Sequence, residues 1–215
     1  MKKYILFATV ISVLSNCWLL SAQTSLVVSG DTWKYHNGSD PGSTWKDVGF
    51  NDASWSSGPS ELGYGDGDEA TVIPTNYPTS YFRRVINVAN PAIFTGGYNL
   101  SVLRDDGIVV YINGIQVYSE NMPASPTYSS WSTATCADDG NTWLSTTLTL
   151  GTLLTGNNTI AVEVHQASAG SSDVTFDLQM QGLIGTPGAT ITRGPYIQTL
   201  TTTSAILSME NQQFG

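Results

Sequence analysis

Apolar and polar residues alternate with a period of two along most of this chain. The alternation is clearest in residues 160–165 and 174–180, which are joined by the small-residue loop 167–172. A period of two places successive side chains on opposite faces of a β-strand. The pattern therefore predicts two half-buried strands. The apolar positions that would face the core are Ile160, Val162, Val164, Val174, Phe176, Leu178 and Met180.

A tight hairpin is predicted at Asn113-Gly114, between the apolar segments 108–112 and 115–118. Asn and Gly tolerate the positive φ angles that a short turn needs to match the twist of its strands. Helical periodicity is almost absent, so the chain is predicted to be all-β. Many short strands pack naturally as a two-sheet β-sandwich or jelly roll. Further strands are expected over 26–29, 81–88, 98–104 and 143–150.

Residues 33–71 interrupt this pattern. The segment is rich in Gly, Asp, Ser and Trp and has no sustained alternation. We expect it to form ordered loops that wrap the ends of the sandwich. Trp33, Trp45 and Trp55 would anchor these loops to the strands beneath.

The first residues are typical of an export signal. Lys2 and Lys3 precede an apolar run, and small or polar residues follow over 21–23. This order indicates a secretory signal peptide over residues 1–23, with no membrane span after its cleavage. The alternative is a lipoprotein, because Leu14-Ser15-Asn16-Cys17 is similar to a lipobox, although Asn16 stands where a small residue is usual.

The last residues are typical of a linker and the start of another domain. Gly185-Thr186-Pro187-Gly188 ends the strand pattern. The predicted organisation is therefore a sandwich domain over 24–184, a linker over 185–190, and a short stub of a second β-domain over 191–215. The stub is too short to fold as a domain.

Composition narrows the class of protein further. Loss of the leader would leave Cys136 as the single cysteine, so the exported domain must be stabilised by its core rather than by a disulfide. The formal net charge is −9, and removal of Lys2 and Lys3 makes it more negative still. Nucleic acid is therefore excluded as an expected partner. Sparse charge with abundant Gly, Ser, Thr and Asn suits an extracellular surface.

A series of short motifs resembles one known family. The motifs lie in order along nearly all of residues 25–183: Phe50-Asn51-Asp52-Ala53-Ser54-Trp55, Leu62-Gly63-Tyr64-Gly65-Asp66, Tyr81-Phe82-Arg83-Arg84, Asp105-Asp106-Gly107, Val110-Tyr111-Ile112-Asn113-Gly114, Val162-Glu163-Val164-His165-Gln166 and Ser171-Ser172-Asp173. Together they resemble the galactose-binding-like jelly rolls of secreted bacterial proteins. The resemblance implies a jelly-roll sandwich that binds a glycan or a cell-surface polysaccharide, or only spaces other domains.

A second resemblance concerns the stub. Thr192-Arg193-Gly194-Pro195-Tyr196-Ile197-Gln198 and the following residues 201–206 are similar to the opening of the fibronectin-like domain that precedes the catalytic domain of purple acid phosphatases. Residues 207–215 depart from that pattern. The resemblance implies that the chain is the front of a metallophosphoesterase whose two-metal site lies in a missing catalytic domain.

No complete catalytic site is expected on this chain. A two-metal phosphatase centre needs several His and carboxylate ligands, and the only histidines are His36 and His165. His165 follows Glu163 on the face opposite the core positions, which predicts a surface or inter-strand hydrogen bond. No Gly-x-Ser-x-Gly nucleophile motif is present. The acidic pairs lie in Gly-bearing loops, where Asp commonly caps turns.

Calcium is a candidate ligand for these acidic loops, because a hard cation prefers several loop oxygens. The candidate ligands are Asp66, Asp68, Glu69, Asp105 and Asp106. The alternative is that these carboxylates cap turns or pair with Arg83, Arg84 or Arg104. No cofactor is required.

A sugar site would combine aromatic platforms with hydrogen-bonding groups. Tyr128, Trp131 and Trp143, with Asp139 and Asn141 nearby, provide that combination. The alternative role of these aromatic residues is packing. The function that follows is a secreted, non-catalytic module that binds carbohydrate or the surface of a bacterial cell. The alternative is a structural spacer or adhesion module without a small-molecule ligand.

Overall fold

The structure is a computed structural model that describes residues 22–149, 151–185, 196–200 and 205–208. Residues 1–21 of the predicted signal peptide and most of the predicted linker lie outside these residues, whereas Ala22 and Gln23 form the start of a strand. The chain divides into two compact units, Met1–Gly185 and Thr186–Gly215. In the second unit, β13 (Tyr196–Leu200) and β14 (Ala205–Ser208) form an antiparallel pair.

One six-stranded sheet of the first unit is built around its longest strand, β12 (Val174–Ile184). Along one edge, β12 pairs with β7 (Tyr98–Asp105) over most of its length. Along the other edge, β12 pairs with β4 (Leu62–Tyr64) near Val174 and with β1 (Ala22–Val27) near Ile184. All pairs are antiparallel except β4 with β5. The remaining strands of this sheet are β5 (Thr71–Val72) and β10 (Leu144–Leu148).

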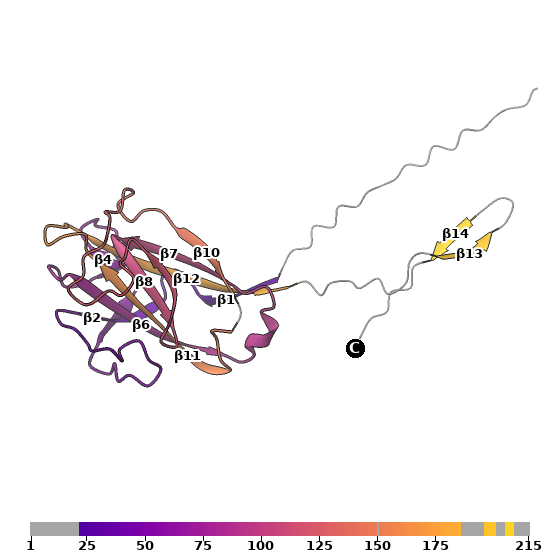
Figure 1. The fold of residues 1–215 in the computed structure, drawn as a ribbon, viewed down its shortest axis with the longest axis horizontal. Helices are drawn as coiled ribbons and strands as arrows, with labels where there is room; N and C mark the ends of the chain where they lie inside the picture. Colours follow the sequence, from indigo (N-terminus) through magenta and orange to yellow (C-terminus); the bar gives the residue numbers. More distant parts are fainter. Residues whose placement is uncertain (1–21, 150, 186–195, 201–204, 209–215) are drawn as a thin grey trace, which may run out of the picture. The chain divides into compact units, whose positions relative to one another are not determined.

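The second six-stranded sheet is antiparallel throughout and has the order β3-β2-β6-β11-β8-β9. Its strands are β2 (Thr32–Asn37), β3 (Ser56–Pro59), β6 (Thr79–Val88), β8 (Gly107–Ile112), β9 (Ile115–Glu120) and β11 (Gly156–His165). Figure 1 shows the two sheets facing one another. A single 3-10 turn at Pro91–Ile93 is capped by the side chain of Asn90. The all-β sandwich predicted from the sequence is confirmed.

The apolar core lies between the two sheets. Phe176 of β12 contacts both Trp33 of β2, at 5.1 Å between ring centroids, and Phe82 of β6, at 4.2 Å. All three are fully buried. The alternating positions 174, 176, 178 and 180 of β12 all point into this core, as their period of two predicts.

A second apolar cluster covers the outer face of the sheet that contains β11. Loops formed by residues 38–55 and 121–135 lie over this face, and Trp45 packs edge-on against Tyr81 and Tyr111. The prediction that β11 is half-buried is therefore wrong, because both of its faces are covered. His165 does not lie on the surface, because it is fully buried. The inter-strand hydrogen bond that was the other predicted role is confirmed: its ring contacts the hydroxyl of Thr79, its partner on β6, at 3.0 Å.

Other predictions had mixed outcomes. The hairpin of β8 and β9 is confirmed, with positive φ angles at Asn113 and Gly114. The segments 160–165 and 174–180 are strands, but they belong to different sheets. The prediction that 33–71 forms only loops is wrong, because it contains most of β2, all of β3 and β4, and the first residue of β5. Trp33 and Trp45 are buried as expected, whereas Trp55 is half-buried.

Candidate functional site

A small open cleft with a volume of about 70 Å³ lies where four segments meet at one end of the sandwich. The end of β4, the loop before β6, the loop around residue 131 and the loop after β11 form its walls. Its lining residues are neutral. They are Tyr64, Asn76, Tyr77, Pro78, Trp131, Gln166, Ser168, Ala169 and Ser171.

The main chain of Gln166 positions two walls of the cleft. Gln166 follows β11 directly, and its N–H donates to the carbonyl of Pro78 at 3.0 Å. Its own carbonyl accepts a hydrogen bond from the N–H of Ser132 at 2.9 Å. The two loops that present Tyr77 and Trp131 are thus fixed to the end of a central strand.

The side chain of Gln166 leaves one acceptor free. Its Nε2 donates to the Tyr64 hydroxyl at 2.7 Å and to the Asp173 carbonyl at 2.9 Å. Gln166 is only 4% exposed, and its buried Oε1 has no hydrogen-bond partner. Burial also raises the pKa of Tyr64, whose hydroxyl therefore stays protonated. A buried amide oxygen without a donor is costly unless a ligand or water supplies one.

Two aromatic side chains beside this amide are open to solvent. Tyr77 is 36% exposed and Trp131 is 41% exposed. Large aromatic surfaces are usually covered in a folded domain, and exposed ones often mark binding sites. The cleft therefore combines apolar ring surfaces with a fixed hydrogen-bond acceptor.

The structure does not bring the five predicted sugar-binding residues together. Trp131 lines the cleft, but Tyr128 stacks on Tyr81 in the outer cluster at 6.4 Å. Trp143 is half-buried next to β10, and Asn141 donates to the carbonyls of Asp138 and Asp139 within a turn. Sequence reasoning missed Tyr64, Tyr77 and Gln166. Tyr64 and Gln166 do lie in two of the motifs that resemble galactose-binding-like modules, and Tyr77 is marked only by the proline that follows it.

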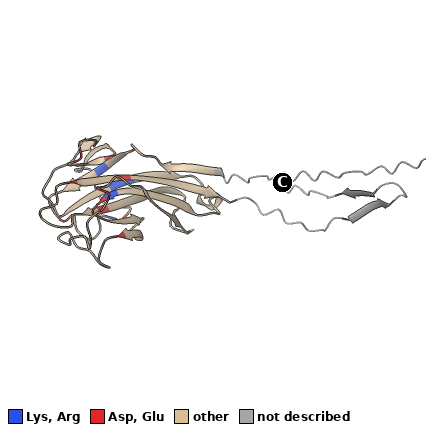
Figure 2. Cartoon of the chain, turned by 90° about the horizontal axis from the view of Figure 1, so that it is seen from above, with Lys and Arg blue, Asp and Glu red and all other residues tan. Residues whose placement is uncertain are grey.

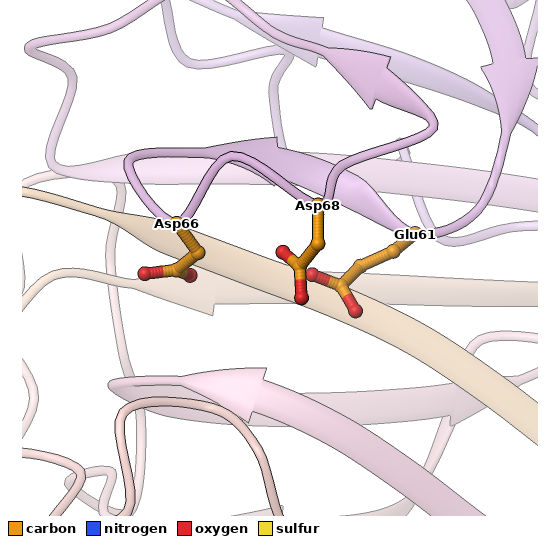
Figure 3. Close-up of side chains that lie close together, drawn as sticks. All are labelled: Glu61, Asp66 and Asp68. Atoms are coloured by element: carbon orange, nitrogen blue, oxygen red, sulfur yellow. The ribbon is translucent and has the colours of Figure 1, made fainter.

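The predicted calcium residues also separate into different roles. Glu69 accepts hydrogen bonds from the N–H groups of Asp66 and Gly67, both at 3.0 Å, and so closes its own loop. The carboxylates of Asp66 and Asp68 lie beside that of Glu61 on one side of the chain, as Figure 3 shows. Burial and these neighbouring charges raise the pKa of Glu61 to about 7.

Asp105 and Asp106 are adjacent but have different roles. Asp106 accepts hydrogen bonds from the N–H groups of Cys136 and Ala167 and from the Ser171 hydroxyl, so it holds one wall of the cleft. Asp105 is 3% exposed, and its Oδ1 has no hydrogen-bond partner. Burial, with the carboxyl groups of Asp106 and Asp173 alongside, raises the pKa of Asp105 to about 9.

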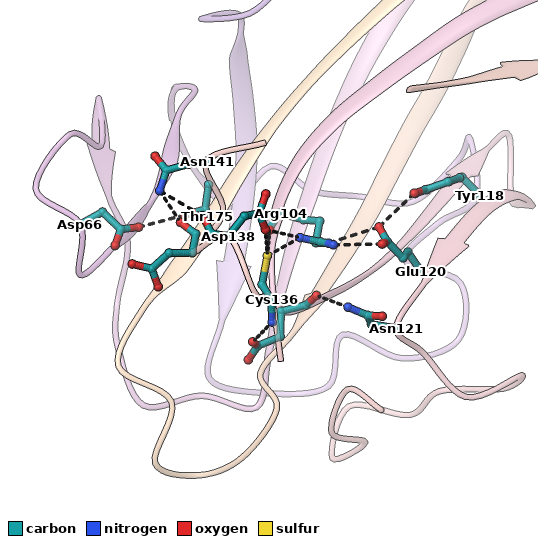
Figure 4. Close-up of polar contacts among 11 residues, drawn as sticks. Asp66, Arg104, Tyr118, Glu120, Asn121, Cys136, Asp138, Asn141 and Thr175 are labelled. Carbon is teal, nitrogen blue, oxygen red and sulfur yellow. Dashed lines mark hydrogen bonds and ion pairs between the residues drawn. The ribbon is translucent and has the colours of Figure 1, made fainter. Parts of the chain in front are cut away.

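The arginines that were the alternative partners of these carboxylates pair elsewhere. Arg83 pairs with Asp52 at 2.9 Å, and Arg84 pairs with Asp31 at 2.9 Å. Arg104 pairs with Glu120 and contacts the thiol of Cys136, in the network drawn in Figure 4. Charged residues gather in the half of the sandwich away from the end of β12 (Figure 2). The carboxylates predicted to bind calcium have no cationic partner in the ion pairs of the described residues, whereas Asp138 pairs with Arg104 at 3.6 Å.

Comparison with known proteins defines the fold only. The sequence matches no protein-family model, and no curated protein matches it. A β-glucuronidase from Bacteroides uniformis superposes with a TM-score of 0.50 and 17% identity, over 74% of this chain and 18% of that enzyme. A glycosyl hydrolase family 2 member from Bacteroides cellulosilyticus gives 0.45 and 15%, over 75% and 20% respectively. The chain thus spans about a fifth of the length of these enzymes.

Within the described part of the chain, no helix has the length and apolar character needed to cross a membrane.

Proposed function

We propose that residues 24–184 form a non-catalytic module that binds a neutral sugar in the cleft beside Gln166. The observation that supports this most is the unpaired Oε1 of Gln166, buried next to the exposed rings of Tyr77 and Trp131. A pyranose offers an apolar face that can stack on an aromatic ring and hydroxyl groups that can donate to a fixed acceptor.

The charge around the cleft favours a neutral ligand over an anionic one. None of the residues that line it is ionised at neutral pH, and no Lys or Arg is among them. Asp173 adjoins the cleft through its carbonyl, and the chain is acidic overall. A uronic acid would meet this negative field without a compensating cation. A neutral hexose or a polysaccharide built from neutral sugars carries no negative charge and would not be repelled by this field.

The likeness to part of a β-glucuronidase adds a fold-level analogy with a carbohydrate-active enzyme. The motifs that resemble galactose-binding-like modules point to the same class of ligand. Export from a bacterial cell, predicted from the first residues, would place the module where such polysaccharides are found.

The test is a glycan array followed by calorimetry with the best neutral glycan. We expect Trp131→Ala to weaken binding at least tenfold, because it removes a stacking platform. Two matched controls keep the test specific. Ile115→Ala removes another exposed apolar side chain, and Trp143→Ala removes the tryptophan that lies outside the cleft. Both controls should bind like the wild type.

Three other outcomes would redirect the proposal. Loss of binding in Trp143→Ala but not in Trp131→Ala would place the sugar on the surface first predicted from the sequence. Preferential binding of uronic acids would contradict the charge argument. Absence of binding to every glycan would favour a spacer or adhesion module.

We also propose that this chain has no hydrolytic activity of its own. His165 is buried beside Glu163, and His36 stacks on Trp55 at 5.2 Å. The groups of described residues suited to holding a metal contain carboxylates and no histidine. Purified chain supplied with zinc, iron or manganese should therefore not hydrolyse an aryl phosphate above the metal-only blank. The origin of the chain in a metallophosphoesterase rests on the resemblance of residues 192–206 and is tested by the gene sequence beyond Gly215.

A further inference from the structure

Three carboxylates from distant parts of the sequence converge beside the cleft. Asp66 follows β4, Asp139 lies in the loop before β10, and Asp173 directly precedes β12. Each of them offers an oxygen within 4.8 Å of an oxygen of the other two. None of the three takes part in an ion pair of the described residues.

Close main-chain contacts hold the three segments in place. A Cβ atom on Gly65 would lie 2.5 Å from Cβ of Asp173, and one on Gly140 would lie 2.6 Å from Oγ1 of Thr175. Only glycine permits these approaches. Thr175 also donates a hydrogen bond to Oδ2 of Asp66 at 3.0 Å, as drawn in Figure 4. The three segments therefore meet in a packed junction, on which the side chains of Asp66 and Asp139 are exposed and that of Asp173 is half-buried.

A fourth carboxyl group, that of Asp105, lies against one of the three and gives an independent indication of a ligand. Asp105 ends β7, opposite Thr175 in the register with β12, and its carboxyl group lies against that of Asp173. Asp105 is almost completely buried, yet its Oδ1 accepts no hydrogen bond. In the metal-free chain a proton offsets the lost hydration of this group, because the pKa of Asp105 is raised to about 9, and a bound cation would take the place of that proton.

We propose that Asp66, Asp139 and Asp173, with Asp105 against Asp173, bind a divalent cation of the calcium type. The donors are all oxygens, which calcium prefers, and they come from loops that can adopt its irregular coordination. Transition metals that favour nitrogen and sulfur ligands are poorly matched to this set. The site differs from the set predicted from the sequence, because Glu69 and Asp106 bind main-chain N–H groups and Asp68 belongs to the cluster with Glu61.

The cation has a structural consequence for the neighbouring cleft. The carbonyl of Asp173 accepts the hydrogen bond from Nε2 of Gln166. A cation bound to the Asp173 carboxylate would therefore hold in place the segment whose carbonyl orients the side-chain amide of Gln166. This inference does not depend on sugar binding, because the cation can be tested alone.

The experiment uses the full chain, freed of metal with a chelator and then titrated with calcium chloride by calorimetry and thermal melting. We expect one calcium ion to bind and the melting temperature to rise by roughly 5–10 °C at a hundredfold excess over Kd. Asp139→Asn and Asp173→Asn should each weaken calcium binding at least tenfold. Asp68→Asn, which neutralises the neighbouring acidic cluster, should bind calcium like the wild type.

The stability of the variants in chelator separates loss of the site from loss of the fold. Each Asn variant removes repulsion between like charges, so it should melt at or above the temperature of the metal-free wild type. The proposal is overturned if millimolar calcium gives neither heat nor a shift in melting temperature. It is also overturned if Asp68→Asn abolishes binding while Asp139→Asn retains it, because the cation would then lie with Glu61.

Discussion

The two faces of the sheet β3-β2-β6-β11-β8-β9 are both buried, but by different means. Its inner face packs on the other sheet through apolar side chains such as Phe82 and Ile160. Its outer face is covered by loops that place aromatic rings, ion pairs and buried hydrogen bonds together, as around Trp45 and Arg83. The comparison teaches that burial in this domain does not require a second sheet. Long loops rich in polar residues can cover one face of a sheet when a few aromatic residues anchor them.

The candidate sugar-binding cleft and the carboxylate cluster are both built from loops at one end of the sandwich. Trp131 belongs to the loop 121–135 that covers the outer face, and Gln166 follows β11, a central strand of the same sheet. The inner core stabilises the fold, while the loops carry the side chains of the candidate sites and can change in sequence without disturbing the sandwich. The predictions below test this division, from the largest expected effect to the smallest.

Phe176→Ala should destabilise the domain most. The ring is fully buried between Trp33 and Phe82, so its removal leaves a cavity in the inner core. We expect a loss of about 3–5 kcal/mol in the free energy of unfolding, measured by denaturant titration. Val85→Ala, at an exposed position of β6, is the control and should change stability by less than about 0.5 kcal/mol. A loss below 1 kcal/mol for Phe176→Ala would contradict the assignment of the core.

Arg83→Ala should have the next largest effect and tests the loop-covered face. The buried guanidinium pairs with Asp52 and donates to the carbonyls of Trp45 and Asp47, so its loss leaves these acceptors unpaired. We expect a loss of about 2–3 kcal/mol. The neighbouring Arg84→Ala breaks a more exposed pair with Asp31 and should cost less than about 1 kcal/mol. Equal effects of the two substitutions would show that the loop cover contributes little.

Tyr111→Phe removes a single hydrogen bond from the outer cluster. The Tyr111 hydroxyl donates to Oε1 of the buried Glu163 at 2.7 Å. We expect a loss of about 1–2 kcal/mol in the free energy of unfolding, because the carboxylate keeps its burial but loses a donor. Tyr118→Phe, whose hydroxyl donates to the more exposed Glu120, is the control and should cost less. No difference between the two would mean that water replaces the donor at Glu163.

Truncation after Gly185 should have the smallest effect, because it touches neither face of the sheet. β12 ends at Ile184, and the N–H of Gly185 donates to the Thr95 hydroxyl. We expect one cooperative melt, with a free energy of unfolding within about 0.5 kcal/mol of that of the full chain. An aggregated product or a broad transition would show that residues 186–215 contribute to the core.

Much of the fold could be predicted from the sequence, because β11 and β12 are marked by local alternation and the hairpin of β8 and β9 is marked by the turn residues Asn113 and Gly114. The short strands β3, β4 and β5 could not, since segments such as Leu62–Tyr64 are too short to show a period. The burial of His165 was also hidden, because the loops that cover it come from distant parts of the chain.

The candidate sites were predictable only in part for the same reason. Trp131 stood out as an aromatic residue in a polar loop, and Asp66 as part of an acidic one. The role of Gln166 has no local signal, because it depends on Tyr64 and on the free oxygen of a buried amide. Asp173 joins Asp66 and Asp139 only through the folding of three separate loops.

The register between β1 and β12 has a mechanical consequence. Thr24, the first residue of the predicted domain, lies opposite Gly182 near the end of β12, so the domain begins and ends at the same end of an antiparallel pair. A force that pulled these two points apart would load the hydrogen bonds between β1 and β12 one after another rather than all together. Tension along the chain would thus peel β1 away at low force, whereas the β7–β12 pairing on the other edge would not be loaded first.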